Sequence, residues 1–273
     1  MNKNKSMLKT FSSLMVVAVA SIVCFTSCQK VIDVKLDEAD KKIVIDAVIT
    51  DHEGGCMVKL SKTKNFNDNN DFIGLGGAVV TIKDETGNTT TLTETTSGVY
   101  TNNQLKGASG KTYQLLVTVE GKSYSASSTM PENVHLDSLY LKTQKFFDEE
   151  ETFSNVVFQD PGGVQNYYLF KQFVNGKRTD GTFIMDDDLS DGKQFKSTLY
   201  LFADDEDKIK SGDIVEVEMQ CIDKAAYKYW YSYDQAASGG GSATPANPVS
   251  NISGGALGSF SAQTVQRKSV IAP

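Results

Sequence analysis

Short segments in which hydrophobic and polar residues alternate recur from residue 41 onward. KIVIDAVIT (42–50) is rich in β-branched residues, as β-strands are. Gly121 separates TYQLLVTVE (112–120) from KSYSASSTM (122–130), which predicts a hairpin turn between two strands. About seven such segments in a row predict a β-sandwich domain over residues 41–131.

The second half of the chain has the same strand-like character, and we assign residues 132–273 to a second, β-rich domain. Asn175-Gly176 and Asp180-Gly181 are dipeptides typical of hairpin turns. In GDIVEVEMQCID (212–223), valines and methionine alternate with glutamates and glutamine, which predicts a half-buried strand. Residues 257–271 are expected to form a last strand that returns to the sheet.

The segment 224–238 (KAAYKYWYSYDQAAS) is compatible with two structures. Tyrosines at every second position from 227 to 233 are typical of a strand. Alternatively, Ala226, Trp230 and Tyr233 share one face of a helix at spacings of three or four residues. The flanking alanines favour the helix, so we expect one short helix in the second domain.

The N-terminus has the pattern of a secretory signal. Three lysines among the first nine residues precede an apolar run over 11–25, which is shorter than the roughly 20 residues that a membrane span needs. Ser27-Cys28 then resembles the cleavage and lipidation site of bacterial lipoproteins; an ordinary signal peptide is the alternative. We therefore expect a signal peptide at 1–27, lipidation of Cys28 and a tether over 28–40.

Charge and composition exclude several functions. The chain has 27 Lys and Arg against 34 Asp and Glu, a net charge of −7, so it lacks the basic character of nucleic-acid-binding proteins. It has two histidines, which leaves little material for a histidine-rich metal site. Cys56 and Cys221 are far apart in sequence and are expected to be isolated buried thiols; a disulfide between them is the alternative.

Candidate catalytic and metal-binding patterns are weak. The acidic run DDDLSDG (186–192) does not complete the twelve-residue calcium loop of an EF-hand in either register. Neither His52 nor His135 lies near a G-x-S-x-G nucleophile pattern. We expect no catalytic residues, no metal and no cofactor, and hence no enzyme.

Aromatic residues are the remaining candidates for ligand contacts. The densest cluster includes Tyr227, Trp230 and Tyr231, and Trp230 is the single tryptophan of the chain. Such rings can stack on sugars or anchor peptides. The alternative is that they pack into the core of the second domain.

Several segments, taken in order, resemble a lipoprotein family of Bacteroidota outer membranes that carries a domain-of-unknown-function label. Its members are often encoded beside SusC-like TonB-dependent transporters. The resemblance rests on the Ser27-Cys28 site, GVYTNNQLKGASGKTYQLLVTVEGKSYSASSTMPENVHLDSL (98–139), GDIVEVEMQCIDKAAYKYWYSY (212–233) and PVSNISGGALGSF (248–260). It implies an immunoglobulin-like or prealbumin-like sandwich followed by a β-rich region, and it carries no catalytic residues over.

This resemblance leads to an expected function. The chain would be a lipid-anchored outer-membrane protein, facing the cell surface, that serves a SusC/SusD-like uptake complex by binding a peptide or glycan. A structural or adhesin-like envelope lipoprotein is the second hypothesis, and a surface hydrolase is the third.

Overall fold

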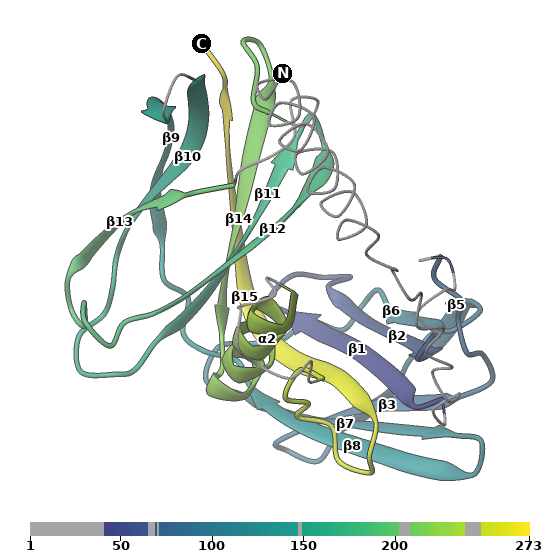
Figure 1. Ribbon diagram of the computed structural model, residues 1–273. Coiled ribbons are helices and arrows are strands. Elements are labelled where there is room, and N and C mark those ends of the chain that lie inside the picture. Colours follow the sequence, from purple (N-terminus) through teal and green to yellow (C-terminus); the bar gives the residue numbers. More distant parts are fainter. Residues whose placement is uncertain (1–40, 65–68, 70, 147–148, 202–207, 238–246) are drawn as a thin grey trace, which may run out of the picture. The chain divides into compact units, whose positions relative to one another are not determined.

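The computed structural model describes residues 41–64, 69, 71–146, 149–201, 208–237 and 247–273. This part of the chain is mostly β with one helix, as predicted (Figure 1). The expected signal peptide, Cys28 and the tether lie outside the described residues. No helix among the described residues has the length and apolar character needed to cross a membrane.

The strands of the first half follow the predicted order closely. They are β1 (Ile43–Thr50), β2 (Cys56–Lys62), β3 (Val79–Asp84), β4 (Thr89–Thr91), β5 (Thr93–Thr96), β6 (Val99–Asn102), β7 (Thr112–Val119) and β8 (Lys122–Thr129). The second half contains β9 (Leu136–Phe146), β10 (Glu149–Gln159), β11 (Tyr167–Val174), β12 (Lys177–Asp186), β13 (Gln194–Leu199), β14 (Ile214–Ile222), α2 (Lys224–Ala237) and β15 (Leu257–Ile271).

One long sheet runs through both halves. Its eight strands follow the order β12-β11-β14-β15-β1-β2-β6-β5. A four-stranded sheet, β4-β3-β7-β8, packs on the part that contains β1 and β2, with Ile45, Val58 and Leu115 in the shared core. A three-stranded sheet, β13-β10-β9, packs on the part that contains β11 and β14, where Phe158, Phe170 and other residues form a second core.

Strand β15 connects the two halves of the long sheet. Its residues 257–263 pair in parallel with β1, and its residues 264–271 pair with β14 in antiparallel orientation. The prediction that the last strand returns to the sheet is confirmed. Phe260 and Ala262 belong to the core of the first sandwich, although they come from the region that we assigned to the second domain.

The turns show where glycine chemistry predicts structure well and where it does not. Asn175 and Gly176 both have positive φ (51° and 79°) and connect β11 to β12, as predicted. The hairpin predicted at Asp180-Gly181 is wrong, because both residues lie inside β12. The ladder between β11 and β12 instead has an irregularity between Lys171 and Phe173.

The segment after β14 is the helix α2, so the preferred prediction for this segment is confirmed. Asp223 caps it, because its Oδ1 accepts a hydrogen bond of 2.8 Å from the backbone amide of Ala226. Ala226 is fully buried against Leu169 and Ile222. The helix therefore covers one part of the long sheet, on the face opposite the second core.

Strand β14 is more deeply buried than its alternation predicted. Val217 and Met219 point into the second core, as expected. On the other face, however, Glu218 and Gln220 are only 6% and 1% exposed, so the prediction of a half-buried strand is wrong. The polar face of β14 belongs to a cavity.

Candidate functional site

A cavity of about 790 Å³ lies on the face of the long sheet that turns away from both cores. Its floor and walls come from β2, β1, β15, β14 and β11, with further residues from β12 and α2. The volume falls within the range of small-molecule sites. We call it the basic cavity, for the charges described next.

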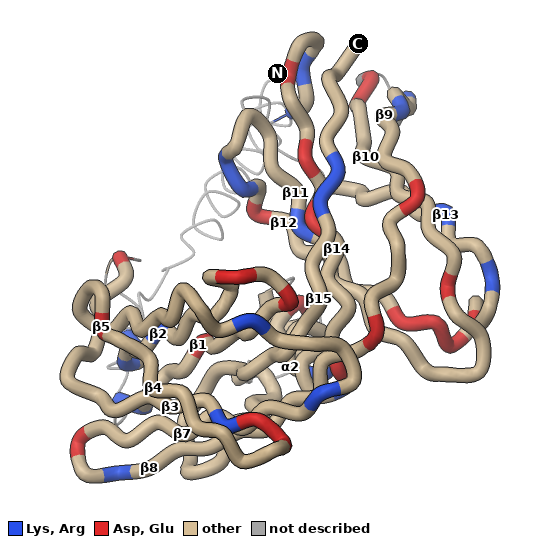
Figure 2. Tube along the Cα trace, turned by 180° about the vertical axis from the view of Figure 1, so that it is seen from behind, with Lys and Arg blue, Asp and Glu red and all other residues tan. Residues whose placement is uncertain are grey.

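The cavity concentrates positive charge in an acidic chain. Its lining contains five Lys or Arg residues and two Asp or Glu residues, so its formal charge is positive. The formal net charge of the whole chain, in contrast, is −7. The cationic residues are Lys59, Lys171, Arg178, Arg267 and Lys268. Figure 2 shows part of this pattern, a basic stretch of β15 beside an acidic stretch of β14. Such a cavity attracts anions.

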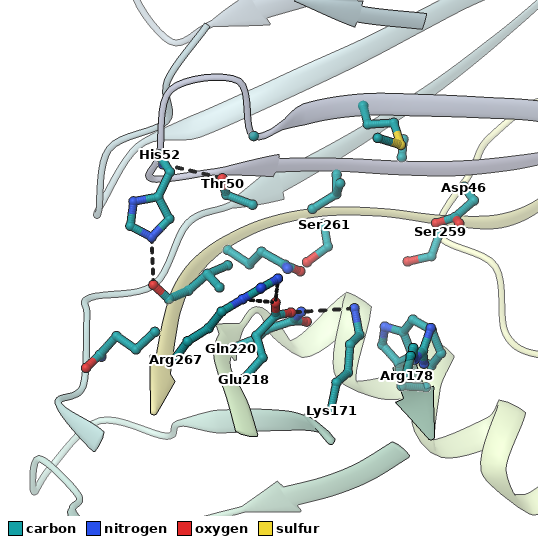
Figure 3. A pocket seen from close by; sticks show the side chains of 18 of the residues that line it. Asp46, Thr50, His52, Lys171, Arg178, Glu218, Gln220, Ser259, Ser261 and Arg267 are labelled. Atoms are coloured by element: carbon teal, nitrogen blue, oxygen red, sulfur yellow. Dashed lines mark hydrogen bonds and ion pairs between the residues drawn. The ribbon is translucent and has the colours of Figure 1, made fainter. Parts of the chain in front are cut away.

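Glu218 is the buried anion at the centre of the cavity. Arg267 donates to its Oε2 from Nε at 2.9 Å and from Nη2 at 2.6 Å, and Lys171 Nζ lies 4.0 Å from Oε1. Gln220 also donates to Oε1. Burial lowers the pKa of Lys171, and the Glu218 carboxylate partly opposes this by raising it. Figure 3 shows Glu218 between its two cationic partners.

Three other cations of the cavity are not engaged in this way. Among the described residues, Lys59, Arg178 and Lys268 form no ion pair. The Arg178 guanidinium donates one hydrogen bond, at 3.1 Å, to the Thr182 hydroxyl. These cations are therefore available to an anionic ligand.

Buried polar atoms without partners face the same cavity. Ser259 Oγ, Ser261 Oγ and Gln220 Oε1 have no hydrogen-bond partner within the described structure, and their residues are 5%, 5% and 1% exposed. Leaving such groups unsatisfied is costly, and all three residues line the cavity. In Figure 3, Ser259 and Ser261 lie across the cavity from Glu218 and Lys171.

The three predicted aromatic contacts have different positions. Trp230 lines the cavity, and Lys171 Nζ lies 5.9 Å from the centroid of its ring. Tyr227 and Tyr231 lie outside the lining. The Tyr227 hydroxyl donates a hydrogen bond of 2.5 Å to Asp186 Oδ2. The ring of Tyr231 stacks on that of Tyr227, with 5.9 Å between the ring centroids. The structure therefore brings one of the three into the candidate site.

Both histidines of the chain line the cavity, although they are far apart in sequence. His52 Nε2 donates a hydrogen bond of 2.8 Å to the carbonyl oxygen of Val265. This contact holds the turn after β1 against β15 and fixes one rim of the cavity. His135 comes from the segment that connects the two sandwiches.

A separate group of carboxylates lies beside the second core. Asp160, Asp187 and Asp191 have oxygens within 4.8 Å of one another, and the first two are buried. The pKa of Asp187 is raised, because burial outweighs the opposing effect of the hydrogen bond from the backbone amide of Asn166. Carboxylate oxygens suit hard cations such as Ca²⁺. In the described part of the chain, this is the one such group that could hold a metal ion.

The two described cysteines are buried and unpaired, as predicted. Burial raises the pKa of the Cys56 thiol to about 12, and it also raises the pKa of Cys221. Thiols of this kind are inert packing residues.

Sequence reasoning missed most of the cavity. Lys171 and Arg178 lie on the hairpin β11–β12, whereas Ser261 lies far along the sequence on β15, and no local motif connects them. One available signal was the polar face of β14, where Glu218 and Gln220 alternate with core residues.

The fold and the cavity define a mostly β protein with a pocket of the size that small ligands occupy. The model of a family described as a domain of unknown function (DUF4249) matches residues 29–269, so the chain belongs to this family. No curated protein matches the chain. Among solved structures, the chain is similar to one described as "Cytokine receptor complex - Crystal form 1A", at 11% identity and a TM-score of 0.26. That match covers 82% of this chain and 94% of the other, and a TM-score this low carries no argument about function.

Proposed function

We propose that the chain is a non-catalytic binding lipoprotein of a Bacteroidota outer membrane, facing the cell surface. It serves as an accessory subunit of a SusC/SusD-like TonB-dependent uptake complex and captures a glycan or a peptide. Lipidation of Cys28 anchors it to the membrane.

The observation that carries the binding role is the basic cavity. It combines cations that lack ion-pair partners in the described structure, such as Arg178, with buried polar atoms that also lack partners, such as Ser261 Oγ. A purely structural spacer gains nothing from either feature, and the buried unpartnered atoms reduce its stability. A ligand that supplies the missing partners recovers that free energy on binding.

A binding assay tests this role. The purified chain is titrated by calorimetry with a panel of oligosaccharides and short peptides. Arg178→Ala should abolish or strongly weaken the observed binding, and Lys122→Ala should not, because Lys122 is an exposed lysine outside the cavity. Absence of binding across the panel would overturn the proposed binding role.

The membrane and transport roles need their own test. The full-length protein with a C-terminal tag is purified from native outer membrane in mild detergent and analysed by mass spectrometry. We expect a diacylglyceryl-modified Cys28 and a stoichiometric SusC-like barrel. Recovery of the lipoprotein alone at several detergent strengths would contradict the accessory role and favour a structural or adhesin-like one.

A further inference from the structure

The basic cavity also indicates the chemistry of its ligand, beyond the general role of binding. The cationic residues outnumber the anionic ones by five to two along its lining, and Arg178 presents a guanidinium with one hydrogen bond to a neighbouring hydroxyl. A guanidinium recognises carboxylates and tetrahedral oxyanions by paired hydrogen bonds. The ligand should therefore carry anionic groups.

The unpartnered polar atoms suit a ligand that both donates and accepts hydrogen bonds. Gln220 Oε1 can only accept a hydrogen bond, whereas the hydroxyls of Ser259 and Ser261 can donate as well as accept. Sugar hydroxyls do both and are densely spaced. The ring of Trp230 adds an apolar wall against which the C–H face of a sugar can pack.

The strand order argues against an extended peptide. Peptides commonly bind β-proteins by adding a strand to an open sheet edge. The floor strands β2, β1, β14 and β11 are internal strands with a neighbour on each side. Strand β15 pairs with β1 over residues 257–263 and with β14 over residues 264–271. Along 257–263, side chains of Asn251 and Ser128 bond to backbone groups of Phe260 and Ala262. The floor of the cavity therefore presents side chains and no open strand edge to a ligand.

We propose that the basic cavity binds a short anionic oligosaccharide whose sugar rings carry carboxylate or sulfate groups. The Arg178 guanidinium pairs with the anionic group, while Ser259, Ser261 and Gln220 bond to hydroxyls. This proposal rests on the binding role proposed above and specifies its ligand class.

The unpartnered serines allow a test that separates binding from stability. Ser261→Ala removes a buried hydroxyl that has no partner, so the variant should be at least as stable as the wild type while it loses affinity. Ser154→Ala is the matched control, because Ser154 Oγ is also buried without a partner in the described structure, but it lies on β10 outside the cavity. It should leave affinity unchanged.

Four probes distinguish the alternatives by calorimetry: trigalacturonate, a chondroitin sulfate tetrasaccharide, neutral maltotriose and tetraglutamate. At least one of the two anionic sugars should bind about tenfold more tightly than maltotriose and tetraglutamate, with binding weakened about tenfold by Arg178→Ala. Binding of trigalacturonate would show that carboxylates suffice. Because chondroitin sulfate carries carboxylates as well as sulfates, binding of this probe without binding of trigalacturonate would indicate that the sulfate is recognised.

Three results would overturn the proposal in different ways. Equal or tighter binding of maltotriose or tetraglutamate would refute the anionic-sugar specificity and leave the binding role intact. If neither the four probes nor any member of the wider glycan and peptide panel binds, both the specificity and the binding role are refuted. An affinity that Ser261→Ala and Arg178→Ala leave unchanged would place the ligand outside the basic cavity.

Discussion

Arg267 lies directly opposite Glu218 in the pairing of β14 with β15, and it donates two hydrogen bonds to Glu218 Oε2. The side chain of Glu218 is 8% exposed, whereas that of Arg267 is 54% exposed. The buried carboxylate thus has a cationic partner that reaches it from the solvent side. This ion pair both supports the sheet and lowers the positive charge of the basic cavity.

Replacing the buried carboxylate should therefore change stability and binding in opposite directions. Glu218→Gln removes the charge that compensates Arg267 and Lys171, and we expect the free energy of unfolding to fall by about 2 kcal/mol. The cavity becomes more positive, so affinity for an anionic ligand should rise by roughly tenfold. Urea unfolding and calorimetry measure the two effects.

The neighbouring glutamate provides the control. Glu216 also contacts Arg267, at 3.0 Å, but its side chain is 33% exposed and it is outside the cavity lining. Glu216→Gln should change stability by less than about 1 kcal/mol and leave affinity unchanged. A Glu218→Gln variant that loses affinity would show that Glu218 contacts the ligand directly.

Asp223 connects the helix to the first sandwich. Its Oδ1 caps α2 through Ala226, and its Oδ2 accepts a hydrogen bond of 2.6 Å from the buried hydroxyl of Ser128. Asp223→Ala should lower the free energy of unfolding by about 2–3 kcal/mol, since it removes a cap and leaves Ser128 without its acceptor. Asp234→Ala, at an exposed position of the same helix, should have little effect on urea unfolding. Equal losses in the two variants would contradict this role.

The buried thiol of Cys56 should make stability fall in alkali. Its pKa is about 12 in the folded chain against an ordinary value of 9.0. A raised folded-state pKa gives stability that is complete below pH 9.0 and is lost as the pH rises toward 12. Between these pH values the free energy of unfolding should fall by about 1.4 kcal/mol per pH unit because of this thiol.

The Cys56→Ala variant isolates that contribution. We expect the variant to be less stable than the wild type at pH 7, because it loses buried volume, but to have a shallower decline in unfolding free energy above pH 9. Chemical unfolding at several pH values between 7 and 11 measures both. If the unfolding free energies of variant and wild type run parallel with pH, the thiol has the same pKa in the folded and unfolded chain, and the prediction is wrong.

Local sequence patterns predicted the strands well because alternation and turn glycines are properties of neighbouring residues. The hairpin at Gly121, the helix at Ala226 and the returning strand at Phe260 follow from such patterns. The hairpin expected at Asp180-Gly181 fails, since the turn at Asn175-Gly176 already reverses the chain and β12 then continues through the second dipeptide.

The cavity was not predictable in the same way. Alternation showed that Glu218 and Gln220 share a face of β14, but it contains no information about what covers that face. The covering comes from the change of partner along β15, which places Ser259 and Ser261 opposite them. Long-range pairing of this kind leaves no local trace in a single sequence.

Gly258 lies where β15 approaches β1 closely, and it should tolerate no side chain. Its φ is +104°, and a Cβ atom there would lie 1.9 Å from the carbonyl oxygen of Ile45, its partner in the parallel pairing. Gly258→Ala therefore combines backbone strain with a clash against main chain that cannot move without breaking the pairing. We expect a loss of more than about 4 kcal/mol, or failure to fold.

Gly255 separates strain from the clash, because its φ is +87° but a Cβ atom there would meet nothing within 4 Å. Gly255→Ala should cost only about 1–2 kcal/mol in thermal or urea unfolding. Hydrogen exchange of the amides of β1 locates the damage: protection should fall in Gly258→Ala and persist in Gly255→Ala. Similar losses of stability in both variants would mean that the positive φ, and not the approach of β15 to β1, explains the glycine at position 258. The basic cavity depends on this approach, since Ser259 and Ser261 follow directly along the same strand.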